Sequence, residues 1–509
     1  MVLRFIFCLT LASAPILVSA GIPSCPPPDP RVFVQITRLE AARDLGNRAL
    51  AGFLQQCNTA LAVRAALAIG RTRKSAGVPL LLRRVTDTDV AMRGMSIYAL
   101  GLIGGIPAAQ PVLNALLHDR AGAVQVAALD ATDRLETAHM LSVTQERQAG
   151  RRIRELLGVG DVIVRARAAT ALEAFHGSAF AHDVVGTLAR AYAREPDSYV
   201  RWHIVWTLFR AYAKRAPVET LQAALHDRAE LVRVEAVRAF GRRGDKSAIA
   251  LLQPLTDDAS WRVQEQTMEA IIALQGGAPT AHLKAIPAGV HTPAPEPDKF
   301  ASLPALPRVP VPCCIIRGSA GSVSSAKAQR PTPDAISTTT KLDPTTIALM
   351  TGPAKGPHPR VRLVTTQGNI YLELFPEWAP LTTENFLNLT QSGYYDNNPW
   401  FRIVPDFVVQ TGDPTGNGNG DAGYTIPAEE NPIEQSSYVI SMGMNYTDPP
   451  NAHAIRDSAG TQFYITLSPQ LHLDKDFTVF GRVIGGTDVL GRLIESDKII
   501  RAERISDSP

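Results

Sequence analysis

The sequence predicts a multidomain fold in which an all-α solenoid of stacked helix pairs is followed by a closed antiparallel β-barrel with capping helices. Three observations support this fold class. A helical phrase recurs through the first half of the chain, a proline-rich stretch interrupts it, and the hydrophobic period then changes to two. The length of 509 residues independently favours more than one domain.

The first residues, 1–20, are expected to form an export signal. A positive start, "MVLR", precedes the apolar stretch "FIFCLTLASAPILV", and "VSA" forms a small-residue cleavage site before Gly21. Cleavage after Ala20 leaves a periplasmic or extracellular chain, in which no later segment is apolar enough to span a membrane. A lipid anchor on Cys25 is a lesser alternative, because Pro23 fits that signal poorly.

The cysteines of the mature chain are few. Cys25 and Cys57 could form a bridge in an oxidising compartment, whereas the adjacent Cys313 and Cys314 have an uncommon geometry for a disulfide. Their spacing does not match a zinc site, so the sequence predicts no bound metal.

Residues 30–285 are expected to form the solenoid. Six phrases recur there, each with an Arg or Gln seven residues before an apolar or small residue, which places both on one stripe of a helix. The phrases are "MRGMSIYAL", "VQVAALDAT", "VRARAATAL", "VRWHIVWTL", "VRVEAVRAF" and "VQEQTMEAI". Their Arg or Gln positions advance by 32, 40, 36, 32 and 31 residues and are Arg93, Gln125, Arg165, Arg201, Arg233 and Gln264.

A period in the thirties with helical patterning is typical of stacked helix pairs. Aspartates precede several phrases, where they can cap a helix start; they are Asp89, Asp161, Asp197, Asp227 and Asp258. The region resembles HEAT repeats of the short bacterial kind, which implies a curved scaffold that binds a client or partner protein. The recurring Arg and apolar positions are themselves expected to stack neighbouring repeats, and the scattered histidines form no catalytic cluster.

Residues 286–357 are expected to form a linker. The segment is first rich in proline, as in "LPALPRVPVP", and then rich in serine and threonine, as in "AISTTTKLDPTT". A long tether of this composition predicts that the two domains move independently.

From residue 358 to residue 505 the pattern becomes that of strands. Two alternating strands flank a Gln-Gly-Asn turn in "RVRLVTTQGNIYLELF", and further strands are expected in "SSYVISMG", "TQFYITLS" and "FTVFGRVI". Helices are expected in "APLTTENFLNLTQSG" and "DVLGRLIES". This number of strands in so short a segment predicts the closed barrel capped by helices.

Four motifs in this region together carry a family resemblance. They are "APLTTENFLNL", "FRIVPDFVVQTGD", "GTQFYITLSPQLHLD" and "FTVFGRV", in that order. The region resembles a cyclophilin-type peptidyl-prolyl cis-trans isomerase, or rotamase. The resemblance implies that Arg402 is the catalytic arginine and that Gln410 helps to orient it and hydrogen-bonds the substrate backbone.

The implied reaction explains why an arginine is used. Rotation about an X-Pro bond breaks amide resonance over a barrier of about 18–20 kcal/mol, and acceleration to milliseconds removes roughly 6 kcal/mol of it. In the twisted transition state the prolyl nitrogen regains a lone pair, so a fixed donor aimed at it favours that state over the planar ground state. A guanidinium stays charged, and the reaction needs no metal, nucleophile or cofactor.

The resemblance also implies a binding wall for the substrate proline. Phe407, Tyr464 and Leu473 match the apolar residues that receive the ring, and Val408 stands where the family often has methionine. The loop at 445–459 is longer than the family pattern and is expected to border the groove.

Several positions depart from the family pattern. Phe401 replaces a histidine, and Gly443 and Met444 replace an alanine-asparagine pair that contacts the substrate backbone. His472 stands near the place of a tryptophan in cyclosporin-sensitive members, and Phe477 takes the place of a histidine. These departures predict an active isomerase with an altered peptide preference.

Two other motifs have plainer explanations. The stretch "DPTGNGNGDAGY" imitates a calcium loop, but Tyr424 stands where a bidentate glutamate is required, so a glycine-rich turn is expected. Asp474 and Asp476 could suggest paired carboxylates for hydrolysis, but their position in a turn predicts solvated side chains.

Charge is distributed unevenly along the chain. Residues 359–509 contain ten Lys and Arg against nineteen Asp and Glu, a balance of −9, which leaves +12 on the remainder of a chain of net charge +3. This asymmetry predicts attraction between the two halves or to an anionic envelope surface. A nucleic-acid partner is not expected, because clustered aromatic and basic motifs are missing from the sequence.

The sequence therefore predicts an exported isomerase that acts on X-Pro bonds of client proteins and carries helical repeats as a scaffold. The alternative is a catalytically weak or inactive module that only binds proline-containing peptides on the same scaffold. Gly443 and Met444 favour the alternative, whereas Arg402, Phe407 and Gln410 favour the enzyme.

Overall fold

The structure is a computed structural model that describes residues 29–179, 181–277, 340–341, 358–447 and 454–505. The predicted signal at 1–20 and nearly all of the predicted linker at 286–357 lie outside these ranges. The domain boundaries given above therefore remain predictions.

One cysteine lies within the described ranges. Cys57 is disulfide-bonded; Cys25, with which the sequence suggests a bridge, and the Cys313–Cys314 pair lie outside the described residues. Among the described helices, none combines the length and apolarity needed to cross a membrane.

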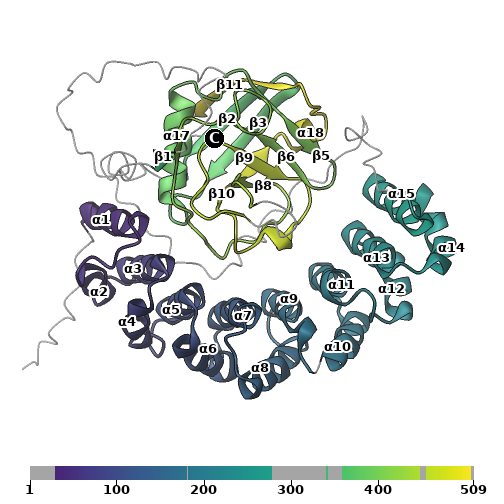
Figure 1. Cartoon of the computed structure of the whole chain (residues 1–509), viewed down its shortest axis with the longest axis horizontal. Helices are drawn as coiled ribbons and strands as arrows, with labels where there is room; N and C mark the ends of the chain where they lie inside the picture. The colour runs from purple at the N-terminus through teal and green to yellow at the C-terminus, as the bar shows by residue number, and fades with distance from the viewer. Residues whose placement is uncertain (1–28, 180, 278–339, 342–357, 448–453, 506–509) are drawn as a thin grey trace, which may run out of the picture.

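The helices of the first half form a curved row of stacked pairs (Figure 1). Odd-numbered helices line the inner side of the arc and even-numbered helices the outer side. The helices are α1 (Pro30–Ala41), α2 (Ala49–Leu54), α3 (Thr59–Thr72), α4 (Val78–Leu82), α5 (Val90–Ile103), α6 (Ile106–His118), α7 (Gly122–Thr137), α8 (Val143–Leu156), α9 (Val162–Ala171), α10 (Ala181–Arg194), α11 (Ser198–Tyr212), α12 (Val218–Leu225), α13 (Glu230–Arg243), α14 (Ile249–Leu252) and α15 (Trp261–Gln275). The predicted helical solenoid is confirmed.

The recurring arginines bind acidic residues of the next repeat, as the stacking interpretation predicts. Arginine-to-carboxylate distances are 2.9 Å for Arg93–Asp119, 2.8 Å for Arg165–Glu195, 2.7 Å for Arg201–Asp227 and 2.7 Å for Arg233–Asp258. The two glutamines at equivalent positions, Gln125 and Gln264, donate instead to the main-chain oxygens of Asp119 and Asp258. The arginine–carboxylate contact thus recurs between neighbouring repeats at the four positions that hold an arginine.

The predicted aspartate caps are confirmed at three of five positions. Asp89, Asp161 and Asp197 are N-caps whose carboxylates accept hydrogen bonds from the first turns of α5, α9 and α11. Asp227 and Asp258 instead lie two residues before the N-cap residues of α13 and α15. Their carboxylates accept hydrogen bonds from the arginine of the preceding repeat. At these two positions the aspartate therefore joins neighbouring repeats.

The second half contains a curled antiparallel sheet with strand order β4-β11-β2-β3-β10-β8-β9-β6-β5. Its strands are β2 (Arg360–Thr365), β3 (Gly368–Leu374), β4 (Asn398–Pro399), β5 (Arg402–Val404), β6 (Val408–Thr411), β8 (Val439–Met442), β9 (Phe463–Thr466), β10 (Val479–Gly485) and β11 (Lys498–Ile505). β1 (Thr340–Lys341) pairs in parallel with β7 (Tyr424–Thr425) outside this sheet. Residues 358–505 are called the sheet domain below.

The prediction of a closed barrel is wrong, because the edge strands β4 and β5 do not pair with each other. Trp400 and Phe401, the two residues between them, do not form a turn, so the chain passes from one edge to the other without folding back into a hairpin. The gap is narrow, since the Thr411 hydroxyl of β6 donates to the Pro399 oxygen of β4 at 2.9 Å. The sheet is therefore an open half-barrel.

An aromatic core shows which side chains of the strands point to the inner face of this sheet. The Phe386 ring of α17 (Pro380–Gln391) lies 5.1 Å from Tyr395, 5.2 Å from Phe463 and 5.3 Å from Phe480, centroid to centroid. Successive strand side chains point to opposite faces, so Tyr464 points away from this core. The second helix of the domain, α18 (Thr487–Leu490), is shorter than the sequence predicts.

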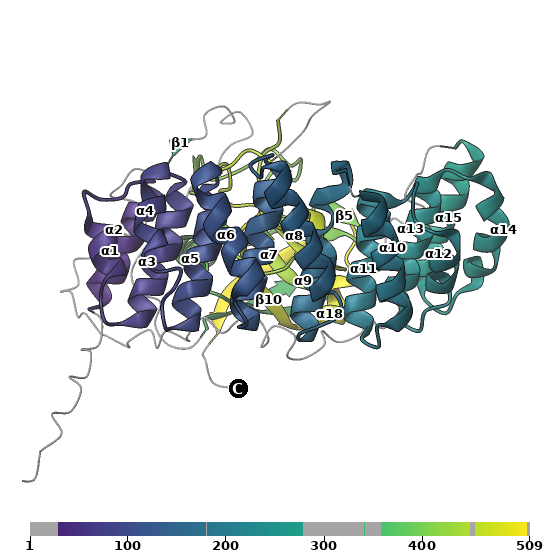
Figure 2. The ribbon, with the colours of Figure 1, turned by 90° about the horizontal axis from the view of Figure 1, so that it is seen from below.

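The sheet domain packs against the inner side of the solenoid (Figures 1 and 2). Arg71 of α3 is fully buried between them: its Nε donates to the Glu430 oxygen at 2.8 Å and its Nη2 to the Trp378 oxygen at 2.7 Å. Its Nη1 lies 2.7 Å from the Glu40 carboxylate of α1. The predicted independent movement of the two domains is therefore wrong.

Ion pairs across this contact follow the charge asymmetry of the sequence. They join Arg43 to Asp457, Arg73 to Glu430, Arg167 to Asp474, Arg238 and Arg262 to Asp406, and Lys475 to Asp133. In all but the last, the solenoid supplies the cation. Attraction between the halves, one of the two alternatives left open above, is confirmed; Asp474 is largely buried here rather than solvated as predicted, whereas Asp476 is exposed.

Candidate active site

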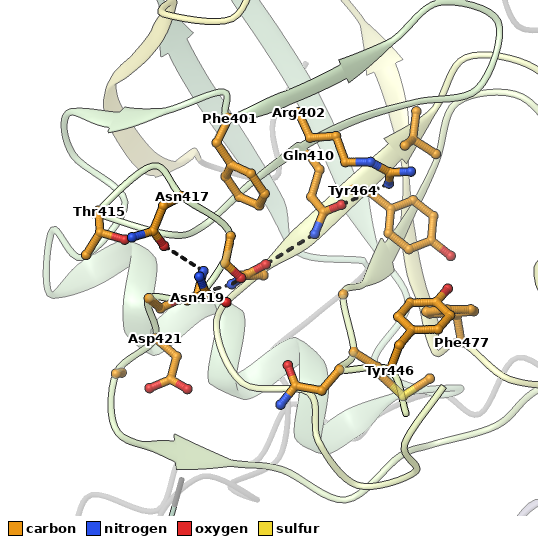
Figure 3. A pocket seen from close by; sticks show the side chains of 18 of the residues that line it. Phe401, Arg402, Gln410, Thr415, Asn417, Asn419, Asp421, Tyr446, Tyr464 and Phe477 are labelled. Carbon is orange, nitrogen blue, oxygen red and sulfur yellow. Dashed lines mark hydrogen bonds between the residues drawn. The ribbon is translucent and has the colours of Figure 1, made fainter. Parts of the chain in front are cut away.

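A groove of about 1450 Å³ opens on the sheet domain (Figure 3). It is formed by β5, β6 and β9 and by the segments at 415–424, 443–446 and 473–477. All but one of the predicted site residues line it, namely Arg402, Phe407, Val408, Gln410, Gly443, Met444, Tyr464, Leu473 and Phe477. This volume is larger than a typical small-molecule pocket and leaves room for an extended peptide.

Arg402 and Gln410 face each other on neighbouring strands. They are direct partners in the β5–β6 register, and the Arg402 Nη1 donates to the Gln410 Oε1 at 3.2 Å. The Gln410 Nε2 in turn donates to the Gln462 Oε1 at 3.2 Å. The Gln462 Nε2 donates to the main-chain oxygens of Gly418 at 2.8 Å and Gly420 at 3.1 Å. This chain of hydrogen bonds fixes the orientation of both amides and so directs an amide oxygen at the guanidinium.

Arg402 is exposed to the groove and lies over an aromatic ring. Its Cζ is 5.3 Å from the centroid of Phe407, a cation–π distance. Loss of solvation lowers the pKa of Arg402, while the nearby Tyr446 and Tyr464 act in the opposite direction. An arginine titrates so far above neutrality that the group remains charged. The guanidinium is thus held by its strand, by Gln410 and by the Phe407 ring beneath it.

The predicted apolar wall is a compact cluster. Val408, Tyr464, Leu473 and Phe477 are buried together, and Phe407 packs against them. The Tyr464 and Phe477 rings meet edge to face, with centroids 5.7 Å apart. Burial raises the pKa of Tyr464 well above its usual value, so the phenol stays neutral.

His472 is the one predicted site residue that does not line the groove. Its ring is stacked on Phe407 at a centroid distance of 5.7 Å and an interplanar angle of 17°. The residue is exposed, and it contacts the wall residue Phe407 without lining the groove itself.

Gly443 provides space beside the amide network. A Cβ at this position would lie 3.3 Å from the Gln410 Nε2 and 3.2 Å from the Gln462 Cβ, both tight contacts. The Gly443 N–H donates to the Gln462 oxygen at 2.8 Å, so this donor is used within the fold. The departure from the family pattern thus leaves the Gln410 amide more room.

The longer loop borders the groove, as the sequence predicts. Tyr446 and Ile455 both line it, and the Tyr446 ring lies 6.1 Å from that of Phe477. Tyr446 and Ala454 form a bridge that closes the loop at its base.

The "DPTGNGNGDAGY" stretch forms the opposite end of the groove (Figure 3). The Asp413 carboxylate accepts hydrogen bonds from the main-chain N–H groups of Thr415, Asn417 and Gly418, which gives the glycine-rich turn that the sequence predicts.

Some groove residues were not identified from the sequence. Gln462 had a usable signal, because it is a polar residue two positions before Tyr464 and period two places both on one face. Asn417 and Asn419 had none, since their approach to the groove depends on the course of the turn.

Both halves of the chain match known protein families. Residues 360–507 match the family described as cyclophilin type peptidyl-prolyl cis-trans isomerase/CLD. Residues 47–133, 185–272 and 218–286 match HEAT repeats.

Individual relatives align with the sheet domain. The chain is 40% identical over 144 residues to peptidyl-prolyl cis-trans isomerase CYP18-2 of Arabidopsis thaliana, which covers 28% of this chain and 85% of the relative. It is 39% identical over 145 residues to peptidyl-prolyl cis-trans isomerase B of Bacillus subtilis, covering 28% of this chain and 95% of the relative. A crystal structure of a cyclophilin type isomerase from Cryptosporidium parvum shares 28% identity at a TM-score of 0.27 and covers 30% of this chain and 99% of that one.

The half-barrel and the groove on it define a peptidyl-prolyl isomerase domain joined to a helical repeat scaffold. The chain belongs to the cyclophilin-type peptidyl-prolyl cis-trans isomerase family.

Proposed function

We propose that the protein is an exported isomerase that rotates X-Pro bonds in proline-containing segments of client proteins, with Arg402 as the catalytic donor. The observation that carries this proposal is the position of Arg402, which lies over Phe407 and is oriented by Gln410 at the edge of an apolar wall. A proline ring placed on that wall brings its nitrogen within reach of the guanidinium.

The proposed mechanism stabilises the twisted amide electrostatically. The ring is held by Phe407 and its neighbours, which orients the bond before rotation. As the prolyl nitrogen becomes pyramidal, the guanidinium donates a hydrogen bond to its new lone pair, an interaction that the planar ground state cannot form. Gln410 serves twice, since its oxygen orients the arginine and its amide can bind the substrate main chain.

Export is supported by two features of the chain. The apolar start at 1–20 has the pattern of a cleaved signal, and Cys57 is disulfide-bonded, which is typical of oxidising compartments. We therefore place the protein in the periplasm or outside the cell, where its clients would be other exported chains.

The solenoid is proposed to contribute a protein-binding surface. HEAT repeats form extended surfaces of this kind, but part of the inner side already contacts the sheet domain. A client would therefore meet the remaining surface of the solenoid while its proline segment enters the groove.

The test is a protease-coupled isomerisation assay on the full chain with a series of X-Pro peptides. Arg402→Ala is expected to lower kcat/KM by about 100-fold or more, because a transition-state donor is lost. Arg501→Ala removes another exposed arginine of the same domain, from β11, and is expected to leave turnover unchanged.

The same assay decides against the alternative function. A folded wild-type protein that accelerates no peptide, yet binds proline-containing segments, would be the catalytically inactive module on a scaffold. Equal activity of wild type and Arg402→Ala would instead exclude the assigned role of the arginine.

A further inference from the structure

The turn that carries Phe407 is held by residues of the solenoid. Asp406 joins β5 to β6, directly before Phe407, and its side chain is 1% exposed. The Arg238 Nη2 of α13 donates to the Asp406 carboxylate at 2.9 Å, and the Arg262 Nε of α15 lies 3.0 Å from its other oxygen. A wall residue of the groove is thus one position from a carboxylate buried against two arginines of the other domain.

The turn has an uncommon backbone conformation that several contacts hold. Asp406 has a φ of +57°, in the left-handed region that few residues other than Gly, Asn and Asp adopt. Its main-chain oxygen accepts hydrogen bonds from the Ser468 Oγ at 2.5 Å and the Gln470 Nε2 at 3.1 Å. A buried carboxylate without a cation is strongly unfavourable, so loss of the arginines would drive Asp406 toward solvent and move Phe407 with it.

A second segment of the wall is held in the same way. Asp474 lies next to Leu473 and accepts a hydrogen bond from the Gln435 N–H at 2.7 Å. Arg167 of α9 is 3.5 Å from its carboxylate and donates to the Pro432 oxygen at 3.3 Å. Lys475 pairs with Asp133 of α7.

The solenoid supports the wall without entering the groove. Every described residue that lines the groove belongs to the sheet domain, between Leu389 and Phe477. The arginines therefore contact Asp406 and Asp474, which are next in sequence to the wall residues Phe407 and Leu473, and they leave the substrate side open.

We infer that Arg238 and Arg262 are positioning residues of the isomerase, which act through Asp406 on Phe407 and so set how tightly the groove holds the substrate proline. This inference rests on the proposed function. The solenoid then has a second role besides any contact with a client, because substrate affinity of the sheet domain depends on its being docked.

The experiment measures kcat and KM separately for the full chain with X-Pro peptides. Arg238→Gln is expected to raise KM by about tenfold, which corresponds to about 1.4 kcal/mol, and to change kcat less than KM because Arg402 and Gln410 stay in place. Arg238→Lys, which retains the charge, is expected to recover most of the affinity. Calorimetric binding of the same peptide gives a readout that does not require turnover.

A matched control lies on the same helix. Arg233 of α13 binds Asp258 inside the solenoid at 2.7 Å, and its hydrogen bonds in the described part of the chain all go to residues of the solenoid. Arg233→Gln is expected to lower stability without changing KM. An equal rise of KM in both variants would show a general effect of destabilisation and would overturn the inference.

A double-mutant cycle tests the inference by also changing Asp406, the partner of Arg238 in the sheet domain. Asp406→Asn should raise KM as Arg238→Gln does. The double variant should raise it by less than the sum of the two effects, because both changes remove the Arg238–Asp406 interaction. Fully additive effects, or an active wild type with unchanged KM in Arg238→Gln, would refute the positioning role. An inactive wild type that binds no peptide would refute the proposed function itself.

Discussion

Arginine performs three different tasks in this chain. Arg402 faces the groove and donates to Gln410, Arg93 and its equivalents join successive repeats, and Arg71 with Arg238 joins the two domains. The first task was predicted from a motif and the second from a recurring spacing. The third carries no such signal, because the domain-joining arginines do not recur at one position of the repeat.

A histidine at the start of the sheet domain gives a pH-dependent prediction. The His358 Nε2 lies 3.0 Å from Glu377, and its Nδ1 lies 3.8 Å from Glu373. Hydrogen bonds to Glu373 and Glu377 raise the pKa of His358 to about 9. Because the folded-state pKa is raised, this pairing contributes its full stability below the unfolded value of about 6.5 and loses it as the pH rises through about 9.

His358→Gln should therefore lower the urea midpoint at about pH 6 and leave it close to wild type at about pH 10. The measurement is the difference between wild-type and variant midpoints at the two pH values, which cancels groups that titrate in both proteins. A difference of the same size at both pH values would contradict the assigned ion pairs.

At the scale of elements, close approach of the inner helices depends on glycine. A Cβ on Gly101 of α5 would lie 2.6 Å from the Ala131 Cβ of α7, and one on Gly241 of α13 would lie 3.1 Å from the Ala270 Cβ of α15. A Cβ on Gly52 of α2 would meet nothing within 4 Å. A glycine-to-alanine substitution is therefore expected to cause a severe steric clash at Gly101, a milder one at Gly241 and none at Gly52.

Gly101→Ala is expected to destabilise the protein, because overpacking costs about 1–3 kcal/mol and outweighs the gain in helix propensity of at most about 1 kcal/mol. Gly241→Ala should have a smaller effect, and Gly52→Ala should stabilise by about 0.4–1 kcal/mol. Chemical denaturation of the three variants tests this order. A stabilised Gly101→Ala would show that α5 and α7 lie farther apart than described.

The elements differ in how well the sequence predicts them. The hairpin of β2 and β3 was predicted because apolar and polar residues alternate on both sides of a Gln-Gly-Asn turn within residues 360–374. The open edge between β4 and β5 was not predicted. A hydrophobic period of two identifies strands, but it does not show whether the first and last strands of a sheet pair with each other. Likewise, the groove residues on β5, β6 and β9 follow from motifs, whereas Asn417 and Asn419 depend on the turn at Asp413.

At the scale of the whole molecule, docking of the two domains was only partly foreseeable. Opposite net charges of the halves predict attraction, but composition alone does not distinguish a partner within the chain from an anionic surface outside it. The contact also uses main-chain oxygens, such as those of Trp378 and Glu430, which are the same for every sequence and leave no trace in composition.

Two arginines of one helix allow the coupling between domains to be tested. Arg64 and Arg71 of α3 both bind Glu40, but only Arg71 also donates to the sheet domain, at Glu430 and Trp378. Loss of one partner of a buried ion pair costs about 3–5 kcal/mol. Arg64→Met and Arg71→Met should therefore both destabilise the first helices, whereas only Arg71→Met also removes hydrogen bonds to the sheet domain.

Hydrogen exchange followed by mass spectrometry on the full chain distinguishes the two effects, because it reports local opening segment by segment. Arg71→Met should accelerate exchange in α1 and α3 and also in the segment at 428–435, whose main chain it holds. Arg64→Met should accelerate exchange in α1 and α3 alone. Unchanged protection of 428–435 in Arg71→Met would mean that the docked arrangement does not depend on this arginine, and the contact would then rest on the ion pairs that join the two domains.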